Sequence, residues 1–222
     1  MGFKLAIDGP AASGKSTISA RLAKELGWEH IDTGSMYRAV TLIALEKKIN
    51  LENESEYSFV KDLDIKYHKG RILVDGRDVS KEIREPIVNE NVSLVSSFPS
   101  VRRELVTLQK KAASVGNVIV DGRDIGTVVM PEADLKIFLI ASVDERTRRR
   151  YLDFINSGKV VDLNKVKEDL QIRDKKDSTR KESPLIKADD AILLDTSDLS
   201  IDETIEAIIK LINDKRGEWL WT

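Results

Sequence analysis

The sequence contains no cysteine, so neither a disulfide framework nor a thiolate metal site is possible. It has only two histidines, His30 and His68, which are isolated and lack the spacing of metal ligands, so both are interpreted as structural. No apolar run approaches the ~20 residues that span a bilayer, and no basic and then apolar leader precedes the first predicted strand. These absences predict a cytoplasmic protein that does not enter a membrane.

The charges are nearly balanced, because 36 lysine and arginine residues stand against 38 aspartate and glutamate residues. A chain with a net charge of −2 has no electrostatic reason to bind nucleic acid or an acidic membrane, so any anion site must be local. Aromatic residues are few, at 5%, whereas 41% of the residues are hydrophobic, as in ordinary soluble proteins. At 222 residues the chain can bury a sizeable core, and we expect one domain with an insertion.

The most informative motif lies near the start of the chain. Residues 4–7 form an apolar run typical of a strand, residues 9–16 spell G-x-x-x-x-G-K-S, and apolar residues from Ile18 onward follow helical spacing. A glycine-rich turn can arise by chance, but this one has the strand and the helix that a phosphate loop requires. The motif predicts a nucleotide site without specifying the reaction, with Lys15 on the outer phosphates and the hydroxyl of Ser16 on Mg²⁺. The residues expected to bind the nucleotide are Gly9, Pro10, Ala11, Ala12, Ser13, Gly14, Lys15, Ser16 and Thr17.

Strands and helices are predicted to alternate along the chain. The five runs typical of strands are residues 4–7, 29–32, 118–121, 135–140 and 191–195. The helix after the last run begins with a capping box, Ser200 with Glu203. This alternation predicts an α/β fold in three layers, with a parallel sheet between helices.

Polar residues follow the second predicted strand directly. The turn Asp32-Thr33-Gly34-Ser35 leads into a helix whose first turn contains Tyr37 and Arg38. Ligands of parallel sheets gather outside the carboxyl ends of the strands. Thr33, Tyr37 and Arg38 should therefore face the loop that holds the nucleotide.

A small antiparallel insert is predicted next. Two short β-like runs, residues 65–67 and 72–74, are separated by Lys69-Gly70 and followed by Asp75-Gly76, and both dipeptides are hairpin signals. A long helical region should then begin at Pro86, since proline fits the first turn of a helix.

The string Val-Asp-Gly-Arg-Asp occurs twice, at residues 74–78 and 120–124. The first copy joins two β-like runs, so a hairpin turn explains it. The second copy leaves an apolar strand at the expected ligand edge, where an arginine and an aspartate in tandem are unfavourable unless they are paired or used. We predict a structural role for the first copy and a functional role for the second.

Three segments leave alternatives open. The basic run over residues 146–150 would ordinarily be a solvated helix face, although its place after a core strand favours a role in the site. Residues 173–180 are either a solvated helix end or ligands of a sugar phosphate. The tail with Trp219 and Trp221 either packs on the domain or contacts a partner.

Taken together, these motifs resemble those of the bacterial cytidylate kinases over essentially the whole chain. The combination is highly specific. One departure is Ala11-Ala12-Ser13, where many family members have a Gly-Ala-Gly pattern. The matching stretches are residues 9–17, 32–38, 82–84, 98–99 with Arg102, 121–129, 173–180 and 183–185.

The resemblance implies a phosphate-loop nucleoside monophosphate kinase that transfers a phosphoryl group from ATP to CMP or dCMP with Mg²⁺, in pyrimidine nucleotide metabolism. It implies one kinase domain over residues 1–222 with a core of residues 1–60 and 118–222, a monophosphate-binding insert at about 61–117 and a lid at about 149–163. We expect a cytoplasmic monomer whose partners are small molecules, without nucleic acid or membrane.

The resemblance also implies roles for individual residues. Catalysis would fall to Lys15, Arg123, Arg149 and Arg150, with Arg146 as a further lid candidate and Asp121 as an outer partner of Mg²⁺. The acceptor would be bound by Thr33, by Arg38, Arg123 and Arg173 at its phosphate, by Asp177 and Arg180 near the ribose, and by Ser93, Arg102 and Asp124 at the base. No general base is required, because the attacking phosphate oxygen is already ionised near neutral pH.

Two alternatives to a cytidylate kinase remain. The first is another small phosphate-loop kinase acting on a different monophosphate or on a small alcohol such as shikimate. The second is a non-catalytic nucleotide-binding regulator, which would bind ATP without CMP-dependent turnover. A GTPase is disfavoured, since residues 164–167 lack the acid of the guanine-binding Asn-Lys-x-Asp motif. The presence of both acceptor-site and lid arginines favours the enzyme.

Overall fold

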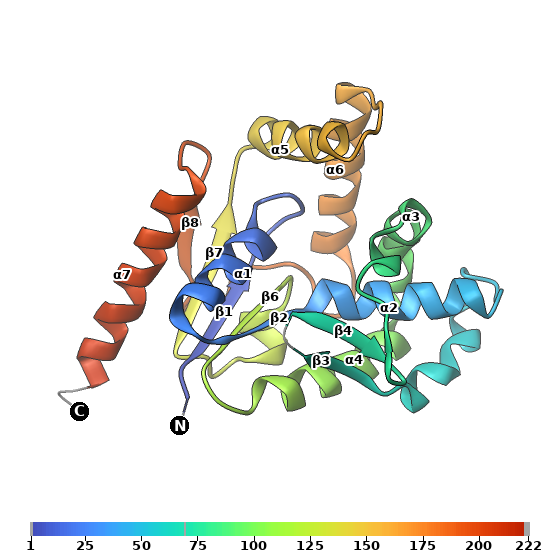
Figure 1. The fold of residues 1–222 in the computed structure, drawn as a ribbon, viewed down its shortest axis with the longest axis horizontal. Helices are drawn as coiled ribbons and strands as arrows, with labels where there is room; N and C mark the ends of the chain where they lie inside the picture. Colours follow the sequence, from blue (N-terminus) through green and yellow to red (C-terminus); the bar gives the residue numbers. More distant parts are fainter. Residues whose placement is uncertain (1, 69, 220–222) are drawn as a thin grey trace.

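The computed structural model describes residues 2–68 and 70–219, so Lys69 of the predicted hairpin turn and Trp221 of the predicted tail contact lie outside the described residues. A parallel five-stranded sheet forms its centre (Figure 1), in the order β2-β6-β1-β7-β8. All five predicted strands and their parallel pairing are confirmed. The strands are β1 (Lys4–Asp8), β2 (Glu29–Asp32), β6 (Val118–Gly122), β7 (Leu135–Ile140) and β8 (Ile192–Asp195).

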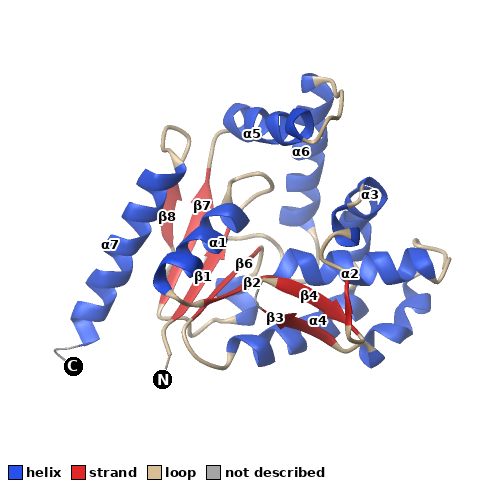
Figure 2. Cartoon of the chain, viewed as in Figure 1, coloured by secondary structure: helices blue, strands red, loops and turns tan. Residues whose placement is uncertain are grey.

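Helices cover both faces of this sheet (Figure 2). Because successive side chains of a strand point to opposite faces, Leu5 and Ile7 of β1 pack with α1 (Lys15–Leu26) and α7 (Ile201–Trp219). Ala6, between them, packs on the other side in a cluster that includes Ala113 of α4 (Pro99–Ala113). The three-layer arrangement predicted from the alternation of strands and helices is therefore confirmed.

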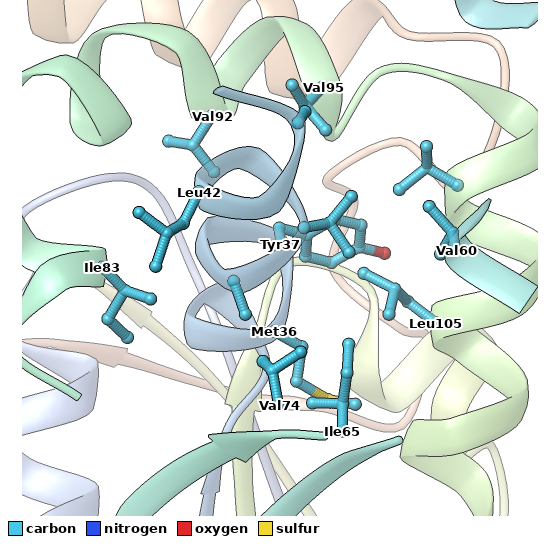
Figure 3. Close-up of a cluster of buried hydrophobic side chains, with 14 of the residues drawn as sticks. Met36, Tyr37, Leu42, Val60, Ile65, Val74, Ile83, Val92, Val95 and Leu105 are labelled. Atoms are coloured by element: carbon cyan, nitrogen blue, oxygen red, sulfur yellow. The ribbon is translucent and has the colours of Figure 1, made fainter. Parts of the chain in front are cut away.

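A second hydrophobic core lies beside the sheet and joins α2 (Thr33–Glu46) to the segment that follows it (Figure 3). That segment contains η1 (Glu54–Asp62), β3 (Ile65–His68), β4 (Arg71–Val74), β5 (Arg77–Asp78), η2 (Glu82–Arg84) and α3 (Pro86–Val95), followed by α4. Its buried side chains include Met36, Tyr37 and Leu42 from α2, Val60, Ile65, Val74 and Ile83 from the middle, and Val92, Val95 and Leu105 from α3 and α4. The core holds α2 and α3 in fixed positions beside the carboxyl ends of the strands.

The small antiparallel sheet predicted in this segment is confirmed, with strand order β3-β4-β5. Asp75 and Gly76 both have positive φ angles, 51° and 82°, and the strands they join are paired from Val74 to Arg77. This is a two-residue turn of the type that twisted hairpins favour. The first Val-Asp-Gly-Arg-Asp copy thus has the structural role that was predicted for it.

Two helices, α5 (Val143–Asn156) and α6 (Leu163–Thr179), pack against each other beyond the end of β7 (Figure 1). Side-chain caps fix where each begins: the Ser142 hydroxyl accepts from the amide of Glu145, and the Asp162 carboxylate accepts from the amide of Lys165. The predicted capping box of α7 is confirmed by reciprocal bonds between Ser200 and Glu203. Among the described helices, none combines the length and the apolar character needed to cross a bilayer.

Candidate active site

The loop between β1 and α1, residues 9–14, has the backbone shape that anion binding requires. Gly9 passes so close to β7 that a Cβ there would lie 2.0 Å from the carbonyl oxygen of Leu139. Gly14 has a φ of 94° at the start of α1, and no side-chain hydrogen bond caps this helix end. The amides and the positive end of α1 are therefore available to an anion, as the phosphate-loop motif predicts.

Lys15, the first residue of α1, is only 4% exposed. Its Nζ donates to the carbonyl oxygen of Pro10 at 2.7 Å and to the Ser13 hydroxyl at 3.2 Å. Burial and the charge of Arg123 lower the pKa of Lys15 well below its usual value. A bound anion would favour the charged ammonium form, so this lysine is suited to phosphate.

Ser16 belongs to a chain of hydrogen bonds that ends at a histidine. Its Oγ donates to Asp121 Oδ2 at 2.7 Å, and His30 Nε2 lies 2.6 Å from the other oxygen of that carboxylate. Burial lowers the pKa of His30, but the hydrogen bond to Asp121 and the charge of that residue outweigh it and raise the pKa above its usual value. His30 thus orients Asp121, the residue predicted to be an outer partner of Mg²⁺.

The donors at this point fit a magnesium ion. Ser16 and Asp121 both line the cavity and offer hard oxygen atoms, which Mg²⁺ prefers. The described residues contain no group of three or more His, Cys, Asp or Glu side chains able to hold a metal ion. The set therefore suits a Mg²⁺ held mainly by phosphate oxygens and water, with the Ser16 hydroxyl as the protein's contribution.

Three arginines from distant segments, Arg38, Arg123 and Arg173, line the same cavity as Lys15. Arg38 on α2 donates to Asp32 at 2.7 Å, and Arg123 after β6 pairs with Asp177 at 2.9 Å. Burial and the charge of Arg123 lower the pKa of Arg173 to about 10. The buried Nε of Arg173 has no hydrogen-bond partner among the described residues. A second bound anion would offset the repulsion among these positively charged side chains.

A nearly buried ion pair forms another wall of the cavity. Arg102 donates to Asp124 at 2.5 Å, and their side chains are 3% and 5% exposed. Arg180 approaches the other carboxylate oxygen at 3.7 Å, and the Arg102 guanidinium lies 5.3 Å from the ring centre of Tyr37. Burial raises the pKa of Tyr37 to about 12, so this residue stays a neutral phenol. Asp124 is thus a carboxylate acceptor held in one orientation.

The arginines of α5 differ in what they contact. Arg149 donates to the carbonyl oxygens of Ser13 and Thr196, at 3.1 and 2.7 Å. The Arg150 guanidinium lies 4.6 Å from the ring centre of Phe154, and burial lowers its pKa. Both arginines line the cavity, but Arg146 does not, because its buried guanidinium binds the Ala11 carbonyl oxygen of the phosphate loop and the Asp174 carboxylate.

Most of the predicted site residues line this one cavity. They are Ala11, Ala12, Ser13, Gly14, Lys15, Ser16, Thr17, Thr33, Arg38, Arg102, Arg123, Asp124, Arg149, Arg150, Arg173, Asp177 and Arg180. Gly9 and Pro10 shape the loop without lining the cavity. Ser93 on α3 also lies outside the lining, whereas Val92 and Ser96 of the same region belong to it, so the part of Ser93 in base recognition stays a prediction.

Sequence reasoning missed the wall formed by Leu199, Ser200, Ile201 and Thr204. These residues follow β8 and begin α7, so they lie at the same edge of the sheet as the phosphate loop. The rule that ligands gather beyond the carboxyl ends of parallel strands was the signal that could have found them. In the sequence, Ser200 and Ile201 have only the pattern of a helix cap and of an apolar helix position.

The cavity encloses about 600 Å³ and differs in charge from the molecule as a whole. Nine basic and six acidic side chains line it, whereas the complete chain has a net charge of −2. The phosphate loop and a second group of cations, Arg38, Arg123 and Arg173, line this same space. The fold and the site together define a phosphate-loop kinase, a class of enzymes that transfer a phosphoryl group from a nucleotide to an acceptor.

Comparison with known proteins gives the family. The model of the family described as Cytidylate kinase matches residues 5–214. A protein of Acholeplasma laidlawii named Cytidylate kinase is 54% identical over 216 residues, 97% of each chain. A protein of Caldanaerobacter subterraneus subsp. tengcongensis, also named Cytidylate kinase, is 49% identical to this chain over 217 residues, again 97% of each chain. The chain belongs to the cytidylate kinase family, as the resemblance of its motifs predicted.

A solved structure supports the fold independently. An uncharacterised protein from Eubacterium ventriosum matches with a TM-score of 0.50 and 14% sequence identity, covering 95% of this chain and 98% of its own. At this identity the likeness concerns the arrangement of the elements alone.

Proposed function

We propose that the protein transfers the γ-phosphoryl group of ATP to the phosphate of CMP or dCMP, giving ADP and CDP or dCDP. The observation that carries this proposal is the meeting of Lys15 with Arg38, Arg123 and Arg173 in one cavity. Each of the two groups of cations suits one of the two phosphate-bearing substrates. Membership of the cytidylate kinase family supports the choice of ATP and a cytidine monophosphate.

The chemistry follows from the charge of the cavity. An ionised oxygen of the acceptor phosphate attacks the γ-phosphorus, and the bond from that phosphorus to the β-phosphate oxygen breaks, leaving ADP. No proton has to be removed by a base. Lys15, Arg123, Arg149 and Arg150 stabilise the negative charge that spreads over the transferring group, which is the main demand of phosphoryl transfer.

The phosphate loop and Ser16 would hold the phosphates of ATP with Mg²⁺. When bound, the ion supplies positive charge to the phosphates. Asp121 accepts the hydrogen bond of the Ser16 hydroxyl and so orients the oxygen of Ser16 for binding to Mg²⁺. Thr33 donates to the carbonyl oxygen of Asp121 at 2.8 Å, which fixes the turn that carries the first acceptor residues.

Asp124 and Arg102 suit cytosine by their hydrogen-bonding pattern. Cytosine presents an amino donor at position 4 and acceptors at N3 and O2, whereas uracil presents acceptor and donor in the opposite order at the first two positions. The Asp124 carboxylate accepts from the amino group, and a guanidinium donates to the ring acceptors. Facing uracil, the carboxylate would meet a second acceptor.

The remaining assignments are part of the same proposal. Asp177 and Arg180 act near the ribose, where Asp177 also pairs with Arg123 at 2.9 Å. Residues 61–117 bind the monophosphate and residues about 149–163 form the lid. The enzyme acts as a cytoplasmic monomer, which cell fractionation and the molecular mass in solution would test.

The direct test is ADP release measured with CMP, dCMP, UMP and AMP as acceptors. We expect rapid release with CMP and dCMP, slower release with UMP and little with AMP. Turnover with shikimate or another alcohol, and none with CMP, would favour the alternative small kinase. Binding of ATP without turnover on any acceptor would favour the non-catalytic regulator.

A further inference from the structure

The ion pair between Arg146 of α5 and Asp174 of α6 holds both peptide groups of Ala11 in the phosphate loop. Arg146 Nη1 donates to the Ala11 carbonyl oxygen at 3.1 Å and to Asp174 Oδ2 at 2.5 Å. The other oxygen of Asp174 accepts from the Ala11 amide at 3.1 Å. The Nε of Arg146 also donates to the carbonyl oxygen of Ala141 at 3.0 Å, so the arginine is anchored at the end of β7.

The loop needs such support at this point. Ala12, the next residue, has a φ of 57°, a left-handed conformation that disfavours any residue with a Cβ by roughly 1–2 kcal/mol. Ala11 also packs in a small cluster with Val166 and Leu170 of α6. The left-handed turn is therefore held from one side by polar bonds and apolar contacts that α6 provides.

The same helix also carries the acceptor-site side chains. Arg173 and Asp177, four residues apart on α6, line the cavity together with Arg180, which directly follows the last residue of the helix. Asp174 follows Arg173 directly and projects about 100° further around the helix, toward the loop. Two neighbouring residues of α6 thus contact the acceptor site and the phosphate loop.

We propose that Asp174, together with Arg146, is a positioning residue that fixes the phosphate loop to α6 and thereby aligns donor with acceptor. This inference rests on the proposed function, because it concerns the two substrates of that reaction. It implies that CMP and the ATP site are coupled, and thermodynamic linkage requires the coupling to be the same in both directions. Asp174 itself touches neither the reacting atoms nor the cavity, and acts through the Ala11 peptide.

The test uses Asp174→Asn and Asp174→Ala. The asparagine keeps an oxygen for the Ala11 amide and loses the charge that pairs with Arg146, whereas alanine removes both. Calorimetric titration gives the dissociation constants of a non-hydrolysable ATP analogue with Mg²⁺ and of CMP, each with and without the other ligand. We expect the affinity for the analogue to fall about tenfold in the asparagine variant and further in the alanine variant. CMP binding alone should change less than about twofold, and the coupling factor should fall toward one.

Asp169→Asn is the matched control. Asp169 lies on the same helix, its side chain is 61% exposed, and it pairs with Lys165. The same loss of charge there should leave both dissociation constants and the coupling unchanged, and thermal unfolding should show that all variants are folded. Wild-type affinity and coupling in the asparagine variant, or an equal loss of CMP affinity, would overturn the inference. A wild-type protein that binds the analogue without binding CMP would overturn the proposed function, and this inference with it.

Discussion

Replacing Asp124 by asparagine should narrow the preference for CMP over UMP. Asp124 is held between Arg102 and Arg180, with its side chain 5% exposed. It can therefore only accept hydrogen bonds, which suits the amino group of cytosine and opposes the O4 of uracil. An asparagine can turn its amide to accept a hydrogen bond from the amino group of cytosine or to donate one to the O4 of uracil. The variant can therefore form a hydrogen bond with either base.

The expected size follows from the cost of an unpaired buried polar group, about 1–3 kcal/mol. That energy corresponds to a factor of about 5 to 150 in the ratio of kcat/KM for CMP to kcat/KM for UMP. The assay is ADP release with each acceptor at saturating ATP. Asp124→Asn leaves the buried Arg102 without the charged partner that it has at 2.5 Å, so the variant is expected to be less stable. The ratio of the two kcat/KM values is therefore the right quantity, because it does not depend on the fraction of folded enzyme.

The repeated Val-Asp-Gly-Arg-Asp string provides the control. Asp78 occupies the same place in the first copy as Asp124 in the second, but it lies on β5 with a side chain 42% exposed. Asp78→Asn should leave the ratio unchanged. An unchanged ratio in Asp124→Asn would remove Asp124 from base recognition, and a change of similar size in both variants would refute the geometric reasoning.

Three further predictions concern catalysis and stability. Lys15→Ala should lower kcat by about a hundredfold or more with little change in the dissociation constant of CMP, and unchanged turnover would exclude Lys15 from catalysis. Burial raises the pKa of Asp8, the last residue of β1, from 3.8 to about 6. The folded state therefore favours the protonated carboxyl, and this contribution to the free energy of unfolding is fully present below pH 3.8 and lost as the pH rises through 6. Between pH 4 and 7 the free energy of unfolding of wild type relative to Asp8→Asn should therefore fall by roughly 2 kcal/mol in urea titrations, and a pH-independent difference would contradict this. Leu105→Ala, at a side chain that is 0% exposed, should lower the free energy of unfolding by about 2–5 kcal/mol, while Leu193→Ala, at 55% exposure, should change it by less than about 0.5 kcal/mol.

Much of the fold was predictable because it depends on local patterns. The apolar runs of β6 and β7 are buried on both faces, and such runs are visible in the sequence without tertiary information. The turn at Asp75-Gly76 and the capping box of α7 follow from the preferences of single residues. The extent of the second core could not be predicted in this way, because Tyr37 and Leu105 meet through contacts between distant helices.

The site was predictable where motif and strand end coincide. The phosphate loop, Arg38 and Arg123 each follow a strand of the parallel sheet, so their meeting follows from the fold. The wall at Leu199 to Thr204 carries no distinctive chemistry, and only its position reveals it. Arg146 illustrates the opposite case: a run of arginines in sequence divides in space, because successive residues of a helix point in different directions.

The central claim is that two anionic substrates occupy one cavity and meet between Lys15 and the group formed by Arg38, Arg123 and Arg173. The most direct test is the binding of a bisubstrate compound in which adenosine and cytidine are joined through a chain of five phosphates. Titration calorimetry should give one molecule bound per chain, displaced by ATP and by CMP alike, with weaker binding after Lys15→Ala and after Arg173→Ala. Displacement by only one of the two nucleotides, or two independent binding sites, would contradict the claim.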